Sequence, residues 1–260
     1  MRRTPSSGKS PGRSFRTALA LGSVAGLAAT SLIVVLPATA AVPGFPNNVV
    51  VFPDRDFVSI EGYADHAGET ATLEVSRPGV GVIGSAQAVV SGTDVAFEVN
   101  HPGGVCWGAD TGLQVTPDIR AGDVVAITFP DGTRDETTTS SATVTKDMTL
   151  DGLMVTVEGT IGQDVNPAQT EQRIINPDLV ELVGRRDVRA TPGPLTPAPK
   201  GGYSSSLEFP TSSTFLATYV FDTAAAAATA AAADLGERAM SWQVEDAAGN
   251  RQGLTIAEFG

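Results

Sequence analysis

Cysteine is almost absent from this chain. The 260 residues include a single cysteine, Cys106, so no intramolecular disulfide can form. A protein without disulfides must be held together by an ordinary hydrophobic core. Without its first 40 residues the chain still has about 220 residues, which is enough for two domains of roughly 100 residues each.

Histidine is nearly as rare, with only His66 and His101. A structural zinc site normally takes four ligands, mostly cysteine and histidine, so this composition excludes a closed zinc site. A Ser-His-Asp triad has few places to form, because both histidines lie in segments with the composition of turns. The chain also lacks a glycine-rich phosphate loop, a GxSxG elbow and an HExxH motif. A pair of carboxylates for glycoside hydrolysis stays open, because such a pair needs only the right spacing in three dimensions.

Basic residues are outnumbered, with 17 Lys+Arg against 29 Asp+Glu. Five of the basic residues and none of the acidic ones lie in the first 40 residues, so the remainder carries 12 minus 29, or −17. An acidic surface repels nucleic-acid phosphates and anionic lipid headgroups. We therefore expect neither nucleic acid nor a membrane surface as a partner.

The N-terminus has the layout of a secretory signal peptide. Basic residues from Arg2 to Arg16 precede a mainly apolar run, Ala18 to Leu36, and Ala38-Thr39-Ala40 offers a small-x-small cleavage pattern. We predict that residues 1–40 are a cleaved signal and that the protein is secreted, extracellular or associated with the cell wall. An uncleaved membrane anchor is the alternative, because about 18 apolar residues can span a bilayer.

Beyond Val49 the dominant hydrophobic period is two, which is typical of strands with one buried and one wet face. Turn sequences such as "RPGVG", "VSGTD" and "PDGTRD" separate these runs. The pattern predicts an all-β protein with two tandem antiparallel immunoglobulin-like sandwiches, residues 47–146 and residues 147–260. The apolar residues that we expect to share a face are Ala71, Leu73 and Val75; Val95, Phe97 and Val99; Leu153, Val155 and Val157; Phe215, Ala217, Tyr219 and Phe221; Met240, Trp242 and Val244.

Three segments interrupt this pattern. We interpret "TTTSSATVT", Thr137 to Thr145, as the last strand of the first sandwich. The proline-rich "TPGPLTPAPKGG", Thr191 to Gly202, is expected to be an extended loop within the second sandwich, because only 58 residues follow it. In the alanine-rich segment, Asp222 or Thr223 can cap a short connecting helix and Gly236 is suited to end it.

The stretch "EVNHPGGVCWGADTG" places His101, Cys106 and Trp107 within seven residues. A catalytic thiol needs a positive neighbour or a helix N-terminus to lower its pKa, but the nearby charges here are Glu98 and Asp110. Apolar neighbours on both sides favour a packed cysteine. We predict a strand-turn-strand corner with Cys106 and Trp107 against the core, and keep a Cys106/His101 enzyme or redox site as the alternative.

Calcium is the one cofactor that the composition leaves open, because it binds clustered carboxylate oxygens. No segment matches the helical calcium loop, and acidic residues in loops are usually solvated. We therefore predict no cofactor, with calcium as the alternative. The acidic and amide residues in predicted turns are Asp54, Asp56, Asp131, Asp135, Glu136, Asp246 and Asn250.

The segment "DAAGN", Asp246 to Asn250, followed by an alternating terminal strand, resembles the last hairpin of bacterial immunoglobulin-like and fibronectin type III-like domains. As a whole, the chain is similar to a recurring family of exported proteins of high-GC Gram-positive bacteria, through "VFPDRDFVSIEGYA", "NHPGGVCWG", "EQRIINPDLV" and "ERAMSWQVEDAAGN". The resemblance covers most of residues 48–260 and implies two tandem sandwiches. It brings no catalytic residue with it, and the first sandwich lacks the Cys-Trp-Cys pattern of antibody domains.

These observations favour a non-enzymatic secreted or cell-surface protein that binds an extracellular protein or glycan through loops at one end of its sandwiches. The alternative is a secreted enzyme or redox protein that uses Cys106 and His101 or a pair of carboxylates.

Overall fold

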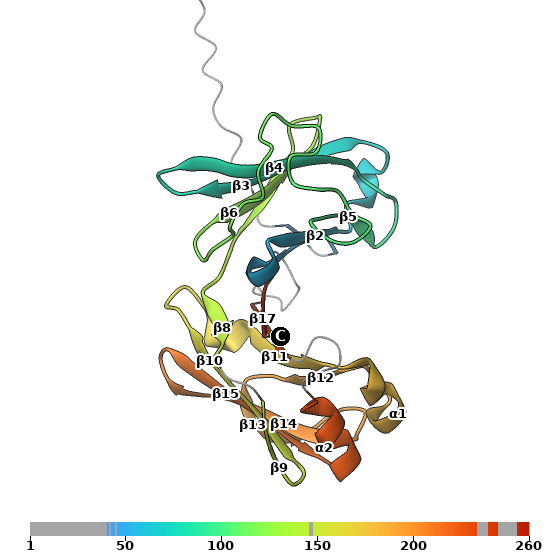
Figure 1. The fold of residues 1–260 in the computed structure, drawn as a ribbon, viewed down its shortest axis with the longest axis vertical. Coiled ribbons are helices and arrows are strands. Elements are labelled where there is room, and N and C mark those ends of the chain that lie inside the picture. Colours follow the sequence, from blue (N-terminus) through green and yellow to red (C-terminus); the bar gives the residue numbers. More distant parts are fainter. Residues whose placement is uncertain are drawn as a thin grey trace, which may run out of the picture. The chain divides into compact units, whose positions relative to one another are not determined.

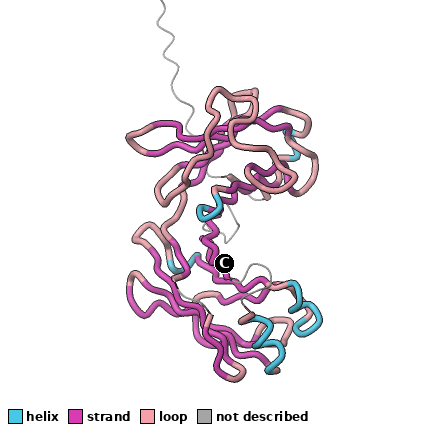
Figure 2. Tube along the Cα trace, viewed as in Figure 1, coloured by secondary structure: helices cyan, strands magenta, loops and turns pink. Residues whose placement is uncertain are grey.

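The computed structural model describes residues 41, 43–44, 46–145, 148–232, 239–243 and 254–259, the last two ranges by their backbone (Figure 1). Strands and loops make up most of this part of the chain, with only short helices between them (Figure 2). The predicted all-β class is therefore confirmed. Neither α-helix in the described ranges is long and apolar enough to cross a bilayer.

Three sheets contain the described strands. The four-stranded sheet has the order β4-β3-β6-β7, with β3 Thr70–Arg77, β4 Gly81–Val89, β6 Val124–Thr128 and β7 Arg134–Thr138. The seven-stranded sheet has the order β12-β11-β16-β17-β1-β2-β5, with β1 Asn48–Phe52, β2 Phe57–Glu61, β5 Val95–Val99, β11 Thr170–Ile175, β12 Asp187–Ala190, β16 Ala239–Gln243 and β17 Leu254–Phe259. The six-stranded sheet has the order β13-β14-β15-β10-β8, with β8 Ala142–Val144, β10 Met154–Ile161, β13 Gly193–Pro197, β14 Tyr203–Thr211 and β15 Thr214–Phe221, while β9 Thr149–Asp151 pairs with β10.

Short helices lie between the strands. The α-helices are α1 Val180–Val183 and α2 Ala224–Ala230, and the 3-10 turns are η1 Pro53–Arg55, η2 Ala64–His66, η3 Pro167–Gln169 and η4 Pro177–Leu179. Helix α2 confirms the predicted alanine-rich helix. Its N-cap is Thr223, whose hydroxyl accepts a hydrogen bond from the backbone N–H of Ala226 at 3.2 Å.

The buried apolar side chains form two clusters. The first draws on β3, β4 and β6 of the four-stranded sheet and on β1, β2 and β5 of the seven-stranded sheet. The second draws on β10, β14 and β15 of the six-stranded sheet, on β11 and β12, and on α2. Alternation of apolar and polar residues produces these clusters directly, because every second side chain of a strand faces the same side. The expected face of β15, from Phe215 to Phe221, is buried throughout, as is that of β3.

Strand β5 departs from its expected pattern at one residue. Val95 is 43% exposed, while its neighbour Ala96 is buried. The register explains this, because Ile60 faces Phe97 but the adjacent Glu61 faces Val95. The extra residue in β5 is a β-bulge, which reverses the alternation on one side of it.

Two further expectations about strands are wrong. Thr137 to Thr145 is not one strand, because Thr137 and Thr138 end β7, which pairs with β6, whereas Ala142–Val144 forms β8, which pairs with β10. Leu153 does not share the buried face of Val155, because it lies in the turn between β9 and β10.

The sheet topology also differs from a purely antiparallel arrangement. Strand β17 pairs with β16 in the antiparallel sense but with β1 in the parallel sense, where Val50 faces Leu254. Strands β16 and β17 confirm the two strands expected near the C-terminus. The expected signal peptide, the join at residues 146–147, the cap at Gly236, the side-chain face of β16 and the "DAAGN" turn lie outside what the structure describes.

Gly159 in β10 gives a test of this packing. A Cβ atom at Gly159 would collide with the Phe215 ring and with the carbonyl oxygen of Thr143 on the neighbouring strands. We expect Gly159→Ala to lower the free energy of unfolding by about 1–3 kcal/mol, because the core must shift to make room. Urea denaturation followed by tryptophan fluorescence measures this change.

The control is Gly112→Ala, because a Cβ atom at Gly112 has no neighbour within 4 Å and this glycine is exposed. Equal unfolding midpoints for the two variants would contradict the packing of β10 between β8 and β15.

Candidate functional site

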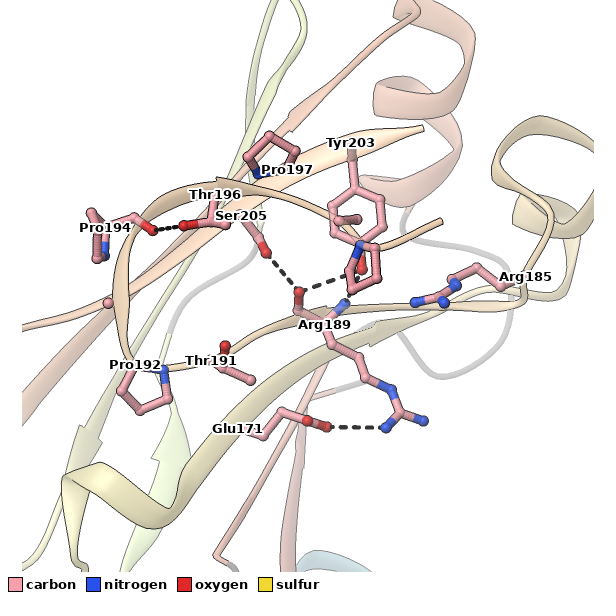
Figure 3. A pocket seen from close by; sticks show the side chains of 13 residues that line it. Glu171, Arg185, Arg189, Thr191, Pro192, Pro194, Thr196, Pro197, Tyr203 and Ser205 are labelled. Atoms are coloured by element: carbon pink, nitrogen blue, oxygen red, sulfur yellow. Dashed lines mark hydrogen bonds and ion pairs between the residues drawn. The ribbon is translucent and has the colours of Figure 1, made fainter. Parts of the chain in front are cut away.

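A groove of about 370 Å³ lies between β12, the following proline-rich segment and the start of β14. We call it the proline–arginine groove. Figure 3 shows the side chains that surround it. Its lining residues are Glu171, Arg185, Arg189, Thr191, Pro192, Gly193, Pro194, Thr196, Pro197, Ala198, Pro199, Tyr203 and Ser205.

One wall of the groove is the proline-rich segment, which is not the loop expected from the sequence. Residues Gly193–Pro197 form β13, an edge strand that pairs with β14 from Gly193↔Leu207 to Pro197↔Ser204. Proline has no N–H to donate, so it is confined to edge strands and bulges, and the register of this hairpin shifts between Gly193 and Thr196. A fixed proline φ makes this wall stiff.

Tyr203 and Ser205 on β14 hold the opposite wall in place. The backbone N–H of Arg189 donates a hydrogen bond to the Tyr203 hydroxyl at 3.0 Å, and the Ser205 hydroxyl donates to the Arg189 carbonyl at 2.8 Å (Figure 3). Strand β12 is an edge strand of its own sheet. The N–H and the carbonyl of Arg189 point away from β11, and no strand of the described chain pairs with them. Tyr203 and Ser205 supply their hydrogen-bond partners and so link β12 to β14.

A second tyrosine supports the groove from the core. The Tyr219 hydroxyl on β15 donates a hydrogen bond to Gln172 on β11, with oxygen distances of 2.6 Å to Oε1 and 2.8 Å to the carbonyl. Complete burial raises the pKa of Tyr219 far above its usual value. The ring centroids of Tyr203 and Tyr219 are 6.0 Å apart. Tyr203 therefore has a packed partner behind it and can hold β12 at a fixed distance.

Four charged side chains on β11 and β12 form a network beside the groove. Arg173 Nε donates to Glu171 Oε1 at 2.9 Å, and Arg189 Nε donates to Asp187 Oδ2 at 2.7 Å. Longer ion pairs cross between the strands, at 3.6 Å from Arg189 to Glu171 and 3.8 Å from Arg173 to Asp187. Arg173 and Arg189 face each other directly in the register, and the diagonal contacts to Glu171 and Asp187 offset the repulsion between the two guanidinium groups.

Burial acts to raise the pKa of Asp187, but the hydrogen bond from Arg189 and the charges of Arg189, Arg173 and Arg185 outweigh it. The pKa of Asp187 is therefore below its usual value. The positive charge of Arg185 acts on Asp187 without a direct contact, because Arg185 forms no hydrogen bond or ion pair with any described residue. In Figure 3 its side chain extends toward the middle of the groove, whereas that of Arg189 turns toward Glu171.

The predicted Cys106/His101 corner is present only in part. Strand β5 ends at Val99, Asn100 and Gly103 take left-handed φ values of 67° and 93°, and Val105 returns to bridge Val99. Trp107 is buried, as expected, and its indole N–H donates to the Asp56 carbonyl at 2.7 Å. Cys106 is exposed, so the expectation that it packs against the core is wrong. Alternation explains this, because Trp107 takes the inward position next to it.

The corner does not assemble a nucleophile and a base. His101 stacks on Phe57, with ring centroids 5.0 Å apart, and its Nδ1 lies 2.9 Å from Glu98 Oε2. Within the described residues no hydrogen bond joins His101 to Cys106. The enzyme or redox alternative stays a prediction that no contact at this corner supports.

Asp56, one of the acidic residues considered for calcium, accepts hydrogen bonds within the fold through its carbonyl and its carboxylate. It takes a left-handed φ of 49°, and its Oδ1 accepts a hydrogen bond from the backbone N–H of Ile119 at 2.7 Å. Burial raises the pKa of Asp56, although this hydrogen bond opposes the effect. Asp131 accepts hydrogen bonds from Thr133 within the β6–β7 turn. Asp246 and Asn250 lie outside the described residues, and among the described residues no three His, Cys, Asp or Glu side chains are grouped as a metal site.

A second hollow, of about 300 Å³, lies beside η2 and is lined by Pro46, Asn47, Tyr63 and His66 among others. His66 stacks on Phe129 with ring centroids 3.7 Å apart, and its Nδ1 lies 2.9 Å from Glu69 Oε2. Tyr63 takes a left-handed φ of 56°, held by a hydrogen bond from its backbone N–H to Asn47 Oδ1 at 2.8 Å. The His66 ring is thus held by residues outside the hollow, and the described residues that line the hollow include no arginine or lysine, so we take the larger proline–arginine groove as the candidate site.

Comparison with protein-family models and with curated proteins gives no match for this chain. The function must therefore be argued from the proline–arginine groove itself.

The exposure of Cys106 predicts its reactivity. We expect the thiol of the native protein to react with a disulfide reagent such as DTNB within about tenfold of its rate in urea, because solvent reaches the sulfur in the folded chain. Stopped-flow absorbance measures both rates. A thiol that reacts only after unfolding would show that the corner is packed as the sequence suggested.

The lowered pKa of Asp187 predicts a pH-dependent contribution to stability. The contribution is present above the unfolded pKa of about 3.9 and is lost as the pH falls through the lower folded value. We expect Asp187→Asn to cost about 0.5–1 kcal/mol at pH 7, after allowing for solvent screening. The difference between parent and variant should shrink in urea titrations carried out toward pH 3.

Asp178→Asn is the matched control, because Asp178 is exposed and its carboxylate forms no ion pair within the described ranges. A pH-independent cost for Asp187→Asn would contradict the ion-pair network.

Proposed function

We propose that this chain is a secreted or cell-surface, non-enzymatic binding protein that captures an extracellular protein or glycan in the proline–arginine groove. The observation that carries the proposal is the groove itself, formed where the Thr191–Gly202 segment folds back over β12. It combines one stiff, proline-rich wall with a few convergent polar groups, which is the usual composition of a binding site.

The groove also lies where binding sites are expected on a β-protein. Most of its lining residues come from the edge strands β12 and β13 and from the connections on either side of them, and Glu171 on β11 with Tyr203 and Ser205 on β14 complete the lining. Connections held by a rigid scaffold are the usual place for ligand contacts. The Tyr203 and Tyr219 hydrogen bonds supply that rigidity, because they hold the walls without a ligand.

We further propose that residues 47–146 and 147–260 are two immunoglobulin-like or fibronectin type III-like sandwiches, preceded by a cleaved signal at residues 1–40. Two hydrophobic clusters support this division, because each contains buried side chains from strands of two sheets. The resemblance to exported proteins of high-GC Gram-positive bacteria agrees with such an architecture.

Filling the groove tests the proposal. Thr196 lines the groove and is exposed, so Thr196→Trp should block a ligand without disturbing the core. We expect the immobilised protein to retain a component of isolated wall polysaccharide or of the extracellular protein fraction of the producing organism. Sugar analysis and mass spectrometry identify what is retained, and Thr196→Trp should retain at least about tenfold less.

The control is Leu195→Trp, because Leu195 is the neighbouring exposed residue of the same strand and does not line the groove. Retention that is equal in the two variants, or no retention by the parent, would overturn the proposed function.

A further inference from the structure

We propose that the ligand of the proline–arginine groove is an acidic, extended peptide segment of a protein, with a carboxylate bound by the Arg185 guanidinium. This inference rests on the proposed function and specifies the chemistry of the ligand. It starts from a contrast between the groove and the rest of the chain.

The first step is the local charge. Residues 171–200 contain five basic residues and four acidic ones, a local balance of +1, in a chain that carries −17 beyond residue 40. These five are nearly half of the 12 basic residues in that part of the chain. A basic patch on an acidic protein attracts anions to one place. The basic residues are Arg173, Arg185, Arg186, Arg189 and Lys200.

The second step is the availability of the charges. The guanidinium groups of Arg173 and Arg189 are engaged by Glu171 and Asp187, which also fix their positions. Arg185 is half-buried and lines the groove, and no described residue neutralises it through a hydrogen bond or an ion pair. A guanidinium in a partly desolvated site binds a carboxylate through two parallel hydrogen bonds. Arg185 is therefore the residue that binds the negative charge of the ligand.

The third step decides between a peptide and a glycan. Tyr203 is the only aromatic residue among the described residues that line the groove, and it is just 3% exposed, so it offers no ring face for a sugar to stack on. One wall is instead formed by prolines, of which Pro194 and Pro197 lie in the edge strand β13. A groove with a stiff apolar wall beside an edge strand suits an extended polypeptide chain. The arrangement therefore favours a peptide ligand over an acidic polysaccharide.

The fourth step concerns specificity. At Arg189 the outer edge of β12 is occupied by Tyr203 and Ser205, so a peptide cannot add to β12 as a further strand at this residue. Recognition must then come from side chains and from the groove walls. The acidic residue of the ligand consequently determines affinity, and its replacement by an amide should be costly.

The experiment is selection of a random decapeptide display library on the purified exported protein. We expect the selected peptides to be enriched in Asp and Glu over the unselected library. Fluorescence anisotropy of the best acidic peptide then compares parent and variants. Arg185→Gln should raise its Kd about 10-fold or more, as should replacing the peptide's acidic residues by their amides.

The matched control is Arg186→Gln. Arg186 is the residue after Arg185, and its substitution removes the same positive charge. Arg186 is exposed, however, and does not line the groove. We expect this variant to bind within about threefold of the parent, because only long-range attraction is lost. Circular dichroism of both variants confirms that they fold alike.

Selected peptides without enrichment in acidic residues would overturn the inference, as would an equal loss of affinity in both variants. Binding of polygalacturonate that depends on Arg185, without binding of acidic peptides, would assign the groove to an acidic glycan and likewise overturn it. If Thr196→Trp abolishes retention of a natural component while acidic peptides fail to bind, the proposed function stands and this inference alone fails.

Discussion

Two tyrosine hydroxyls set how the two sheets meet beside the groove, in addition to the hydrophobic cluster packed between them. Tyr219 reaches from β15 to Gln172 on β11, and Tyr203 reaches from β14 to the backbone of Arg189 on β12, so each joins the six-stranded sheet to the seven-stranded one. A chain with one cysteine has no disulfide to do this. The hydroxyls must be paired because a buried polar group without a partner is costly. The requirement for pairing therefore fixes which strands of the two sheets face each other.

The groove is a consequence of that spacing. Tyr203 and Ser205 hold β12 beside β14, and the proline-rich strand β13 pairs with the side of β14 that β15 leaves free. Proline limits the conformations available to that strand, and the ion pairs among Arg173, Glu171 and Asp187 limit those of β11 and β12. Both walls of the groove are thus held by contacts within the chain, and a preformed groove lowers the entropic cost of the proposed binding.

Much of the fold was predictable because alternation is a local signal. The faces of β3 and β15 and the capped helix α2 follow from residues adjacent in the sequence. Three of the errors share one cause, which is that a neighbouring strand decided the outcome. A bulge against β2 turned Val95 outward, pairing with β10 separated β8 from β7, and pairing with β14 made an edge strand of the proline-rich segment. No single-strand pattern contains these registers.

The candidate site shows the same division. The sequence drew attention to Cys106 and His101 because rare residues stood close together, yet the structure exposes the thiol and pairs the histidine with Glu98. The sequence also contains the cluster of arginines from Arg173 to Arg189. Counting charges over a short window of the sequence could have found this cluster. By itself the sequence determined composition, net charge, the all-β class and the positions of most strands, because each depends on neighbouring residues. Only the tertiary structure decided that Arg185 would lie beside prolines in a groove, because that proximity depends on which strand edges meet across two sheets.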